Sequence, residues 1–113
     1  MYDVLNELNK TSGITGSMVV GKDGIVIAAD LEESLESETV GALAASITTN
    51  IQKSLDRLES TPLSQVTIEA EQGKLFFSDA DIGILVVTTE KKVNIGLIRL
   101  EIKNAIGKLK IAG

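Results

Sequence analysis

Apolar residues recur at two different spacings along the chain, and the change between them predicts the order of the elements. Residues 3–10 have apolar positions at helical spacing and are followed by a Thr-Ser-Gly stop. Residues 14–20 and residues 25–29 are strand-like, and a short loop ending in Asp23-Gly24 separates them. Two strand-like runs on either side of an Asp-Gly turn predict a β-hairpin.

A long helix is predicted next, after an acidic stretch from Asp30 to Glu38 that suits the positive end of a helix. Ser37 is the expected N-cap, and Ser60-Thr61-Pro62 closes the helix. Basic residues near residue 57 suit its C-terminal end. Its large apolar residues lie three or four positions apart, which predicts one apolar stripe made of Val40, Leu43, Ile47, Ile51, Leu55 and Leu58.

Three strands and a final helix complete the order. Residues 65–71 alternate polar and apolar positions with period two, which is typical of a strand with one solvated face. Residues 74–78 form its partner strand, and residues 82–88 are apolar on both faces, which indicates a central strand. Asn94 caps the final helix, whose predicted buried side is Ile95, Ile98, Ile102, Ala105, Ile106 and Leu109. The pattern predicts a single α/β (α+β) domain over residues 1–113.

The amino-acid composition excludes several classes of function. The chain has no cysteine and no histidine, so it lacks a thiolate nucleophile, a thiolate metal site and the commonest general base. The net charge of −5 argues against nucleic acid, which needs a basic surface, and favours a basic protein partner. No signal peptide and no membrane span is recognised. We therefore expect a soluble, cytoplasmic, non-enzymatic protein that binds other proteins and uses no cofactor and no metal.

Two motif-like segments do not support a ligand site. Residues 16–23 come close to a phosphate-binding loop, but Asp23 replaces the hydroxyl that contacts magnesium and a strand follows Lys22 where a helix is needed. Asp79, Asp81 and Glu90 match three positions of a calcium loop, but apolar strand residues occupy the positions of its other ligands. Both segments are predicted to be turns between strands.

One side of the long helix carries small residues and almost no charge, whereas a solvated side normally carries pairs of Lys and Glu. Small side chains permit close approach of another backbone. Either a second protein or the chain's own sheet covers this side, and the sequence leaves both possibilities open. The residues are Gly41, Ala42, Ala45, Ser46, Thr48, Thr49 and Gln52.

The hairpin and the final helix together resemble the roadblock/LC7 domain over nearly the full length of the chain. The resembling segments are residues 12–28, with a Gly-rich entry and an Asp-Gly turn, and residues 94–100 at the start of the last helix. The resemblance implies a five-stranded antiparallel sheet with the central helix on one face and the two terminal helices on the other. It also implies a homodimer, formed by pairing of the third strand and packing of the central helices across a two-fold axis.

The resemblance also suggests contact residues. For the dimer these are Gly41, Ala42, Ala45, Thr48, Thr49, Gln65, Thr67, Ile68 and Glu69. Prokaryotic members of the family are partners of small Ras-like GTPases, which would place Glu38, Ala42, Ala45, Thr49 and Gln52 near the GTPase. Glu69 and Glu71 would weaken strand pairing if they met like charges across the axis.

The leading prediction is a homodimeric regulator or scaffold that binds a small Ras-like GTPase through its paired central helices. An alternative is an assembly subunit whose dimer is itself the function. A small-ligand sensor is disfavoured because the predicted strands offer mainly aliphatic side chains, whereas a ligand site needs convergent polar groups. Nucleotide hydrolysis is the least favoured of the four.

Overall fold

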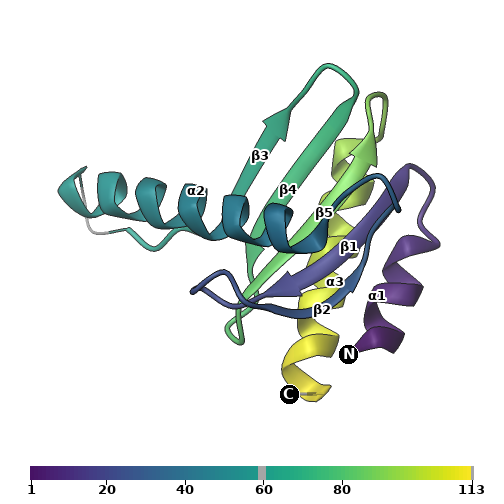
Figure 1. The fold of residues 1–113 in the computed structure, drawn as a ribbon, viewed down its shortest axis with the longest axis horizontal. Coiled ribbons are helices and arrows are strands. Elements are labelled where there is room, and N and C mark those ends of the chain that lie inside the picture. Colours follow the sequence, from purple (N-terminus) through teal and green to yellow (C-terminus); the bar gives the residue numbers. More distant parts are fainter. Residues whose placement is uncertain (59–60, 113) are drawn as a thin grey trace.

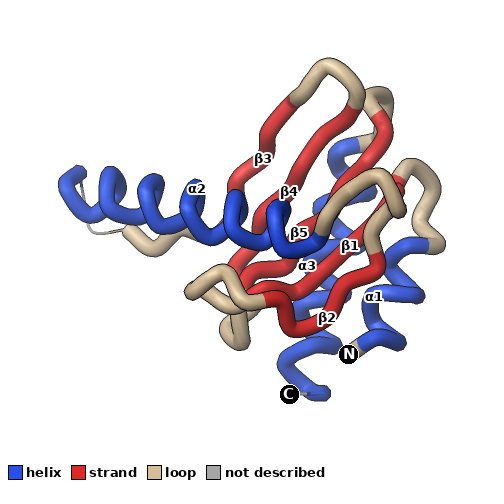
Figure 2. The backbone as a smooth tube through the Cα atoms, viewed as in Figure 1, coloured by secondary structure: helices blue, strands red, loops and turns tan. Residues whose placement is uncertain are grey.

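The structure, a computed structural model, describes residues 1–58 and 61–112. It contains a five-stranded antiparallel sheet between two layers of helices (Figures 1 and 2). The helices are α1 (Tyr2–Asn9), α2 (Ser37–Leu58) and α3 (Ile95–Ala112), and the strands are β1 (Ile14–Val20), β2 (Val26–Asp30), β3 (Gln65–Glu69), β4 (Gly73–Asp79) and β5 (Ile84–Glu90). The strand order is β2-β1-β5-β4-β3. The predicted element order and fold class are confirmed, and the apolar strand β5 is central.

The predicted boundaries are shifted by one or two residues at several ends. Ser37 is the first helical residue of α2 and not its cap, because the Val40 N–H donates to the carbonyl of Glu36 at 3.0 Å. The predicted cap of α3 is confirmed, since Asn94 Oδ1 accepts a hydrogen bond from the Leu97 N–H at 3.1 Å. The last strand begins at Ile84, two residues late, because the preceding residues form a hydrogen-bonded turn.

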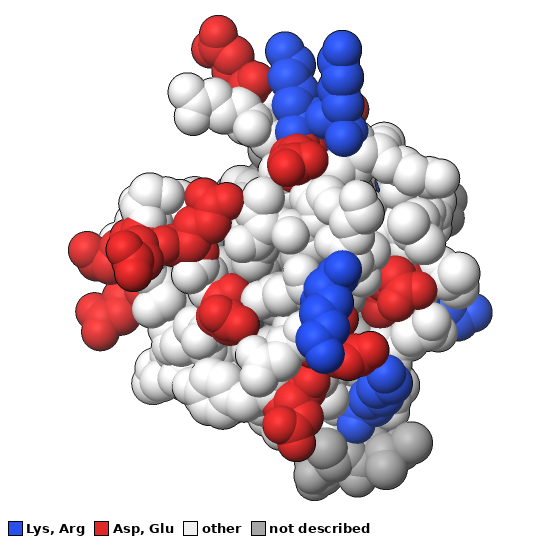
Figure 3. Space-filling model, turned by 90° about the vertical axis from the view of Figure 1, so that its right-hand side faces the viewer, with Lys and Arg blue, Asp and Glu red and all other residues white. Residues whose placement is uncertain are grey.

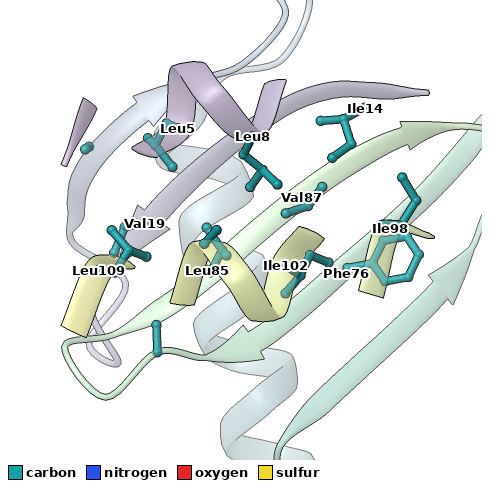
Figure 4. Close-up of a cluster of buried hydrophobic side chains, with 13 residues drawn as sticks. Leu5, Leu8, Ile14, Val19, Phe76, Leu85, Val87, Ile98, Ile102 and Leu109 are labelled. Carbon is teal, nitrogen blue, oxygen red and sulfur yellow. The ribbon is translucent and has the colours of Figure 1, made fainter. Parts of the chain in front are cut away.

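One face of the sheet is covered by α1 and α3. The cluster on this face joins side chains of both helices to inward-facing strand residues such as Val19, Phe76 and Leu85, and these three are completely buried (Figure 4). The predicted apolar side of α3 supplies Ile98 and Ile102 to it. Burial of large aliphatic and aromatic side chains contributes roughly 1.5–3 kcal/mol each, so this layer is the main stabilising core.

The opposite face is covered only in part by α2. Its cluster has six buried residues, including Met18, Phe77 and Val86, and eight more that are only partly buried. The buried residues of α2 are all small, namely Gly41, Ala44 and Ala45. The large apolar stripe that the periodicity predicts along α2 is not uniformly covered, because Leu43 is 45% exposed and Leu58 is 77% exposed.

The reason is the direction of α2. The helix crosses the sheet and continues past the edge formed by β3, so that its C-terminal end lies beyond the sheet (Figure 1). Twenty-two residues of α-helix span about 33 Å, whereas five strands are about 19 Å across from first to last. A helix in this direction cannot bury its whole length on its own sheet.

Candidate protein-binding surface

The segment that resembles a phosphate-binding loop is a tight hairpin. Residues 16–20 lie within β1, which pairs with β2 on one side and with β5 on the other. Their backbone groups therefore form the hydrogen bonds of the sheet. The Gly21 N–H donates to the carbonyl of Ile25 at 2.8 Å, and Asp23 Oδ1 accepts from the Ile25 N–H at 3.0 Å. Gly24 has φ +89°, which a glycine adopts easily. The prediction of a turn is confirmed.

The segment that resembles a calcium loop is likewise a turn between β4 and β5. Asp79 Oδ1 accepts a hydrogen bond from the Asp81 N–H at 3.0 Å, and Asp81 Oδ2 lies 3.4 Å from Lys110 Nζ of α3. Across the described ranges, no three acidic, histidine or cysteine side chains stand close enough to hold a metal ion. Among the same residues, no helix combines the length and apolarity that crossing a membrane requires.

The small residues of α2 divide between two environments. A Cβ atom added to Gly41 would lie 3.0 Å from Val20 Cγ2 and 3.3 Å from the carbonyl of Gly24, so α2 packs closely on the hairpin at this point. Ala45 is also buried there, 3.7 Å from the position of a Cβ on Gly24. The chain itself therefore covers Gly41 and Ala45, while Ala42 remains exposed.

Three further residues proposed for contact lie on or near this side of α2. Glu38 and Thr49 are exposed. Gln52 is half-buried, because its side chain holds the connection to β3: its Oε1 accepts from the Leu63 N–H at 2.8 Å and its Nε2 donates to the Thr61 carbonyl at 3.1 Å. Gln52 thus has a structural task within its own chain.

The half-buried Thr48 donates its hydroxyl to the carbonyl of Ala44 at 2.8 Å. The hydroxyl is therefore satisfied within α2 itself.

A second side of α2 is apolar and largely uncovered, and we call it the apolar flank. At 100° per residue its members fall within one quarter of the helix circumference, turned away from Gly41 and Ala45. Its residues are Leu43, Ile47, Ile51 and Leu58. Leu43 and Leu58 are exposed, and the other two are half-buried. The helical periodicity placed all four residues in one apolar stripe but could not show that this part of the stripe stays largely uncovered.

Strand β3 forms one edge of the sheet and is bonded only to β4 among the described strands. The Ser64 carbonyl accepts a hydrogen bond from the Asp79 N–H at 3.0 Å, and the Ala70 N–H donates to the Gly73 carbonyl at 2.8 Å. The backbone groups of even-numbered residues in this strand therefore point toward β4. Hydrogen-bonded positions alternate along an antiparallel ladder. The backbone groups of Gln65, Thr67 and Glu69 therefore point outward, free to pair with another strand.

Side chains near this edge are divided by the two faces of the sheet. Val66, Ile68 and Leu75 lie on the α2 face and are only partly buried. Glu69 lies 3.7 Å from Lys74, whose side chain is 12% exposed and whose Nζ also donates to the Lys91 carbonyl at 2.6 Å. The charge of Glu69 thus has a partner within the chain.

The surface charge is unevenly distributed. Figure 3 shows a group of acidic side chains at one side of the molecule with no basic side chain beside it. Glu32, Glu33, Glu36 and Glu38 precede or begin α2, are exposed, and form no ion pair with any described basic residue. The N-terminal end of α2 is therefore suited to a basic surface.

Sequence comparison decides the family. A model of the Roadblock/LC7 domain matches residues 1–89. The chain belongs to the Roadblock/LC7 family. Two proteins of Methanocaldococcus jannaschii, MJ0310 and MJ1340, are each 50% identical to it over 107 residues, which cover 95% of this chain and 94% of theirs.

Several solved structures share the fold. The Roadblock/LC7 domain from Streptomyces avermitilis superimposes with a TM-score of 0.92 at 17% identity, covering 99% of this chain and 96% of that one. Myxococcus xanthus MglB gives a TM-score of 0.88 at 20% identity, covering 95% and 82%. The likeness to the first structure includes α3, which the family match over residues 1–89 does not reach. The resemblance drawn from the hairpin and the final helix is confirmed.

Proposed function

We propose that this Roadblock/LC7 protein is a non-catalytic homodimeric regulator or scaffold that binds a small Ras-like GTPase through its paired central helices. The observation that carries the proposal is the overhang of α2. The apolar flank extends past a free sheet edge, and the sheet beside that edge has its own incompletely covered apolar face. Exposed apolar surfaces of this kind mark protein interfaces.

The outward groups of β3 suggest how two chains pair. A two-fold axis through Thr67 aligns the five residues of β3 with the same five of a second chain and lets Gln65, Thr67 and Glu69 form a complete antiparallel ladder. Glu69 then faces the partner's Gln65 and not another carboxylate. This pairing removes the like-charge conflict at Glu69, and Glu71 lies in the turn beyond the strand.

The same axis places the overhanging helices on the sheets. The apolar flank of α2 from each chain would cover the partly buried side chains of Val66, Ile68 and Leu75 of the other chain. Each chain would supply its apolar flank to the incompletely covered sheet face of the other chain, as a self-complementary two-fold interface requires. Among the small residues suggested for the dimer, Ala42 and Thr49 remain accessible, whereas Gly41 and Ala45 act indirectly by setting the position of α2.

The GTPase surface is proposed on the outward side of the paired helices. Glu38, Ala42 and Thr49 are exposed on the side of α2 opposite the apolar flank, and Glu38 belongs to the unpaired acidic group at the N-terminal end of the helix. This surface suits a partner with small and basic residues. Binding of a GTPase is the function that the family resemblance implies for prokaryotic members, and gliding protein MglB of Thermus thermophilus shares the fold with a TM-score of 0.83.

The first experiment tests the dimer, and a second tests the binding of a GTPase. Light scattering is expected to give twice the chain mass of 12.0 kDa for the native protein. Thr67→Pro is expected to give the monomer, because the Thr67 N–H points away from β4 and its loss breaks no hydrogen bond among the described residues. Thr67→Val is the matched control and keeps the dimer. A native monomer at high concentration would refute the assembly.

Binding is then measured with the Ras-like GTPases of the same organism in their GTP and GDP forms. The native dimer is expected to bind at least one of them, and Thr67→Pro to bind more weakly because it presents single helices. A dimer that binds no GTPase in either state would overturn the regulatory proposal. That result would favour the assembly-subunit alternative.

A further inference from the structure

A cavity of about 250 Å³ lies beneath the C-terminal half of α2, at the end of the sheet where the β1–β2 and β4–β5 turns meet. Its walls come from α2, from the segment that leads into β3, and from the hairpin turn. The volume is slightly below the usual range for ligand pockets, roughly 300–1,000 Å³, and suits a small molecule. The family match does not account for it, and of the proposed GTPase surface only Thr49 lines it.

The cavity is held open by hydrogen bonds. Gln52 fixes the chain before β3 against α2 through its bonds to Thr61 and Leu63, and it donates a further bond to Asp56 Oδ1 at 3.0 Å. Leu63 and Ser64 are thereby held as one wall opposite the hairpin. A pocket formed in this way needs little reorganisation when a ligand enters.

The rim of the cavity is cationic. Lys22 reaches it from the hairpin and Lys53 from α2, both are exposed, and neither forms an ion pair with a described carboxylate. Asp79 supplies one negative charge, and its Oδ1 already accepts from the Asp81 N–H. The rim therefore has one net positive charge in a chain whose net charge is −5.

The floor of the cavity is apolar. Phe77 and Ile84, which are 1% and 4% exposed, line it together with Leu63. The exposed Thr49 and Ser64 hydroxyls border the floor, and no hydrogen bond within the described chain occupies them. A charged rim, hydroxyl donors and an apolar floor therefore converge on one space, which the mainly aliphatic strands alone did not predict.

We infer that this cavity binds a small organic monoanion, a carboxylate with a short apolar tail. The tail lies on Phe77 and Ile84, and the carboxylate accepts hydrogen bonds from the two ammonium groups and the adjacent hydroxyls. Inorganic phosphate would leave the apolar floor unfilled. A polyphosphate carries more negative charge than the single net positive charge of the rim can balance.

The site remains open in the proposed dimer. The lining residues Thr48, Thr49 and Gln52 lie on the side of α2 away from the apolar flank that would meet the second chain. The inference does not depend on a GTPase, because ligand binding is measured on this protein alone. Its failure would leave the GTPase experiment unaffected, and the reverse also holds.

The test is a titration of the ¹⁵N-labelled native protein with hexanoate, followed by amide chemical shifts. Hexanoate is expected to shift amides of residues 48–53, 63–64 and 77–84, because these segments line the cavity. Hexan-1-ol and inorganic phosphate, which lack the charge or the tail, are each expected to bind several-fold more weakly. Equal binding of either one, or shifts that map elsewhere, would overturn the inference.

Charge variants complete the test. Single changes of exposed ion-pair partners alter affinity by up to about fivefold, so Lys22→Ala and Lys53→Ala together are expected to weaken hexanoate binding about tenfold. Lys91→Ala with Lys92→Ala is the matched control, since both lysines are exposed and lie between β5 and α3. If the control pair weakened binding as much, the attraction would be non-specific and the site would be refuted.

Discussion

The two faces of the sheet differ in how completely the chain covers them. On the α1 and α3 face, thirteen residues of the described chain form one buried cluster with four partly buried neighbours. On the α2 face, six buried residues are surrounded by eight that are partly buried. The first face is a finished core, whereas the second has more apolar surface than its single helix can cover. The unfinished face is where partners are expected.

The difference arises from how the helices cross the sheet. α1 and α3 pack with large aliphatic residues, such as Leu8 and Ile102, that point toward the sheet. α2 approaches through Gly41, Ala44 and Ala45, which allows close contact but little apolar burial. The large residues Leu43 and Leu58 lie on the apolar flank of α2 and stay exposed. A helix in this position is stabilised by its own chain at one end and is available to another chain at the other.

The largest expected effect compares two neighbouring residues of β4. Phe76 and Phe77 are 0% and 1% exposed but point to opposite faces. Phe76→Ala should lower the free energy of unfolding by about 4–5 kcal/mol, because the close-packed cluster around it cannot collapse into the space. Phe77→Ala should lower it by about 3 kcal/mol, since Phe77 already borders the cavity. Urea unfolding by circular dichroism measures both.

The same pair of variants also tests whether a second chain covers the α2 face of the sheet. If a partner completes the α2 face, the stability of the native protein and of both variants rises with protein concentration, because dimerisation stabilises the folded chain. Equal losses for Phe76→Ala and Phe77→Ala would contradict the distinction between a finished and an unfinished face.

The element order and the fold could be read from the sequence because periodicity is local. The alternation in residues 65–71 predicted a strand, which is β3, and the apolar run in residues 82–88 predicted a central strand, which is the position of β5. The Asn94 cap was predicted from residue type alone. Boundaries shifted where a turn or a neighbouring carbonyl, such as that of Glu36, decided the first residue of an element.

The candidate surface was less predictable because the direction of α2 is set by tertiary packing. Helical periodicity shows that Leu43 and Leu58 share a stripe but not which chain covers it, and it could not show that Gly41 packs on the hairpin. The length of α2 was the available signal, since a helix of 22 residues is longer than five strands are wide. The cavity could not be predicted, because Lys22, Gln52 and Ser64 meet only in the folded chain.

An intermediate effect is expected at the polar link that fastens α1 to the finished face. Asn9 Nδ2 donates to the Asp30 carbonyl at 3.1 Å and to Asp30 Oδ2 at 3.0 Å, and Asn9 Oδ1 accepts from the buried Ser17 hydroxyl at 2.7 Å. Asn9→Ala should lower the free energy of unfolding by about 1–3 kcal/mol, because Ser17 loses its acceptor. Urea unfolding measures the loss.

A double-mutant cycle is the control for Asn9. Ser17→Ala removes the other partner, and Asn9→Ala in that background should lower the free energy of unfolding by less than in the native chain. Additive losses would show that the Asn9–Ser17 bond contributes nothing.

The smallest effect on folding, and the most specific for assembly, is expected at exposed leucines of the two helix layers. Leu58 of α2 is 77% exposed and Leu100 of α3 is 53% exposed, so Leu58→Asp and Leu100→Asp should each change the unfolding free energy of the monomer by no more than about 0.5 kcal/mol. In sedimentation equilibrium, Leu58→Asp should weaken the dimer at least tenfold, because it places a carboxylate on the apolar face of the second sheet. Leu100→Asp should leave the dimer unchanged, since the α1 and α3 face is complete in each chain. If Leu100→Asp weakened the dimer and Leu58→Asp did not, the interface would lie on the finished face, and the proposed role of the overhanging helix would be wrong.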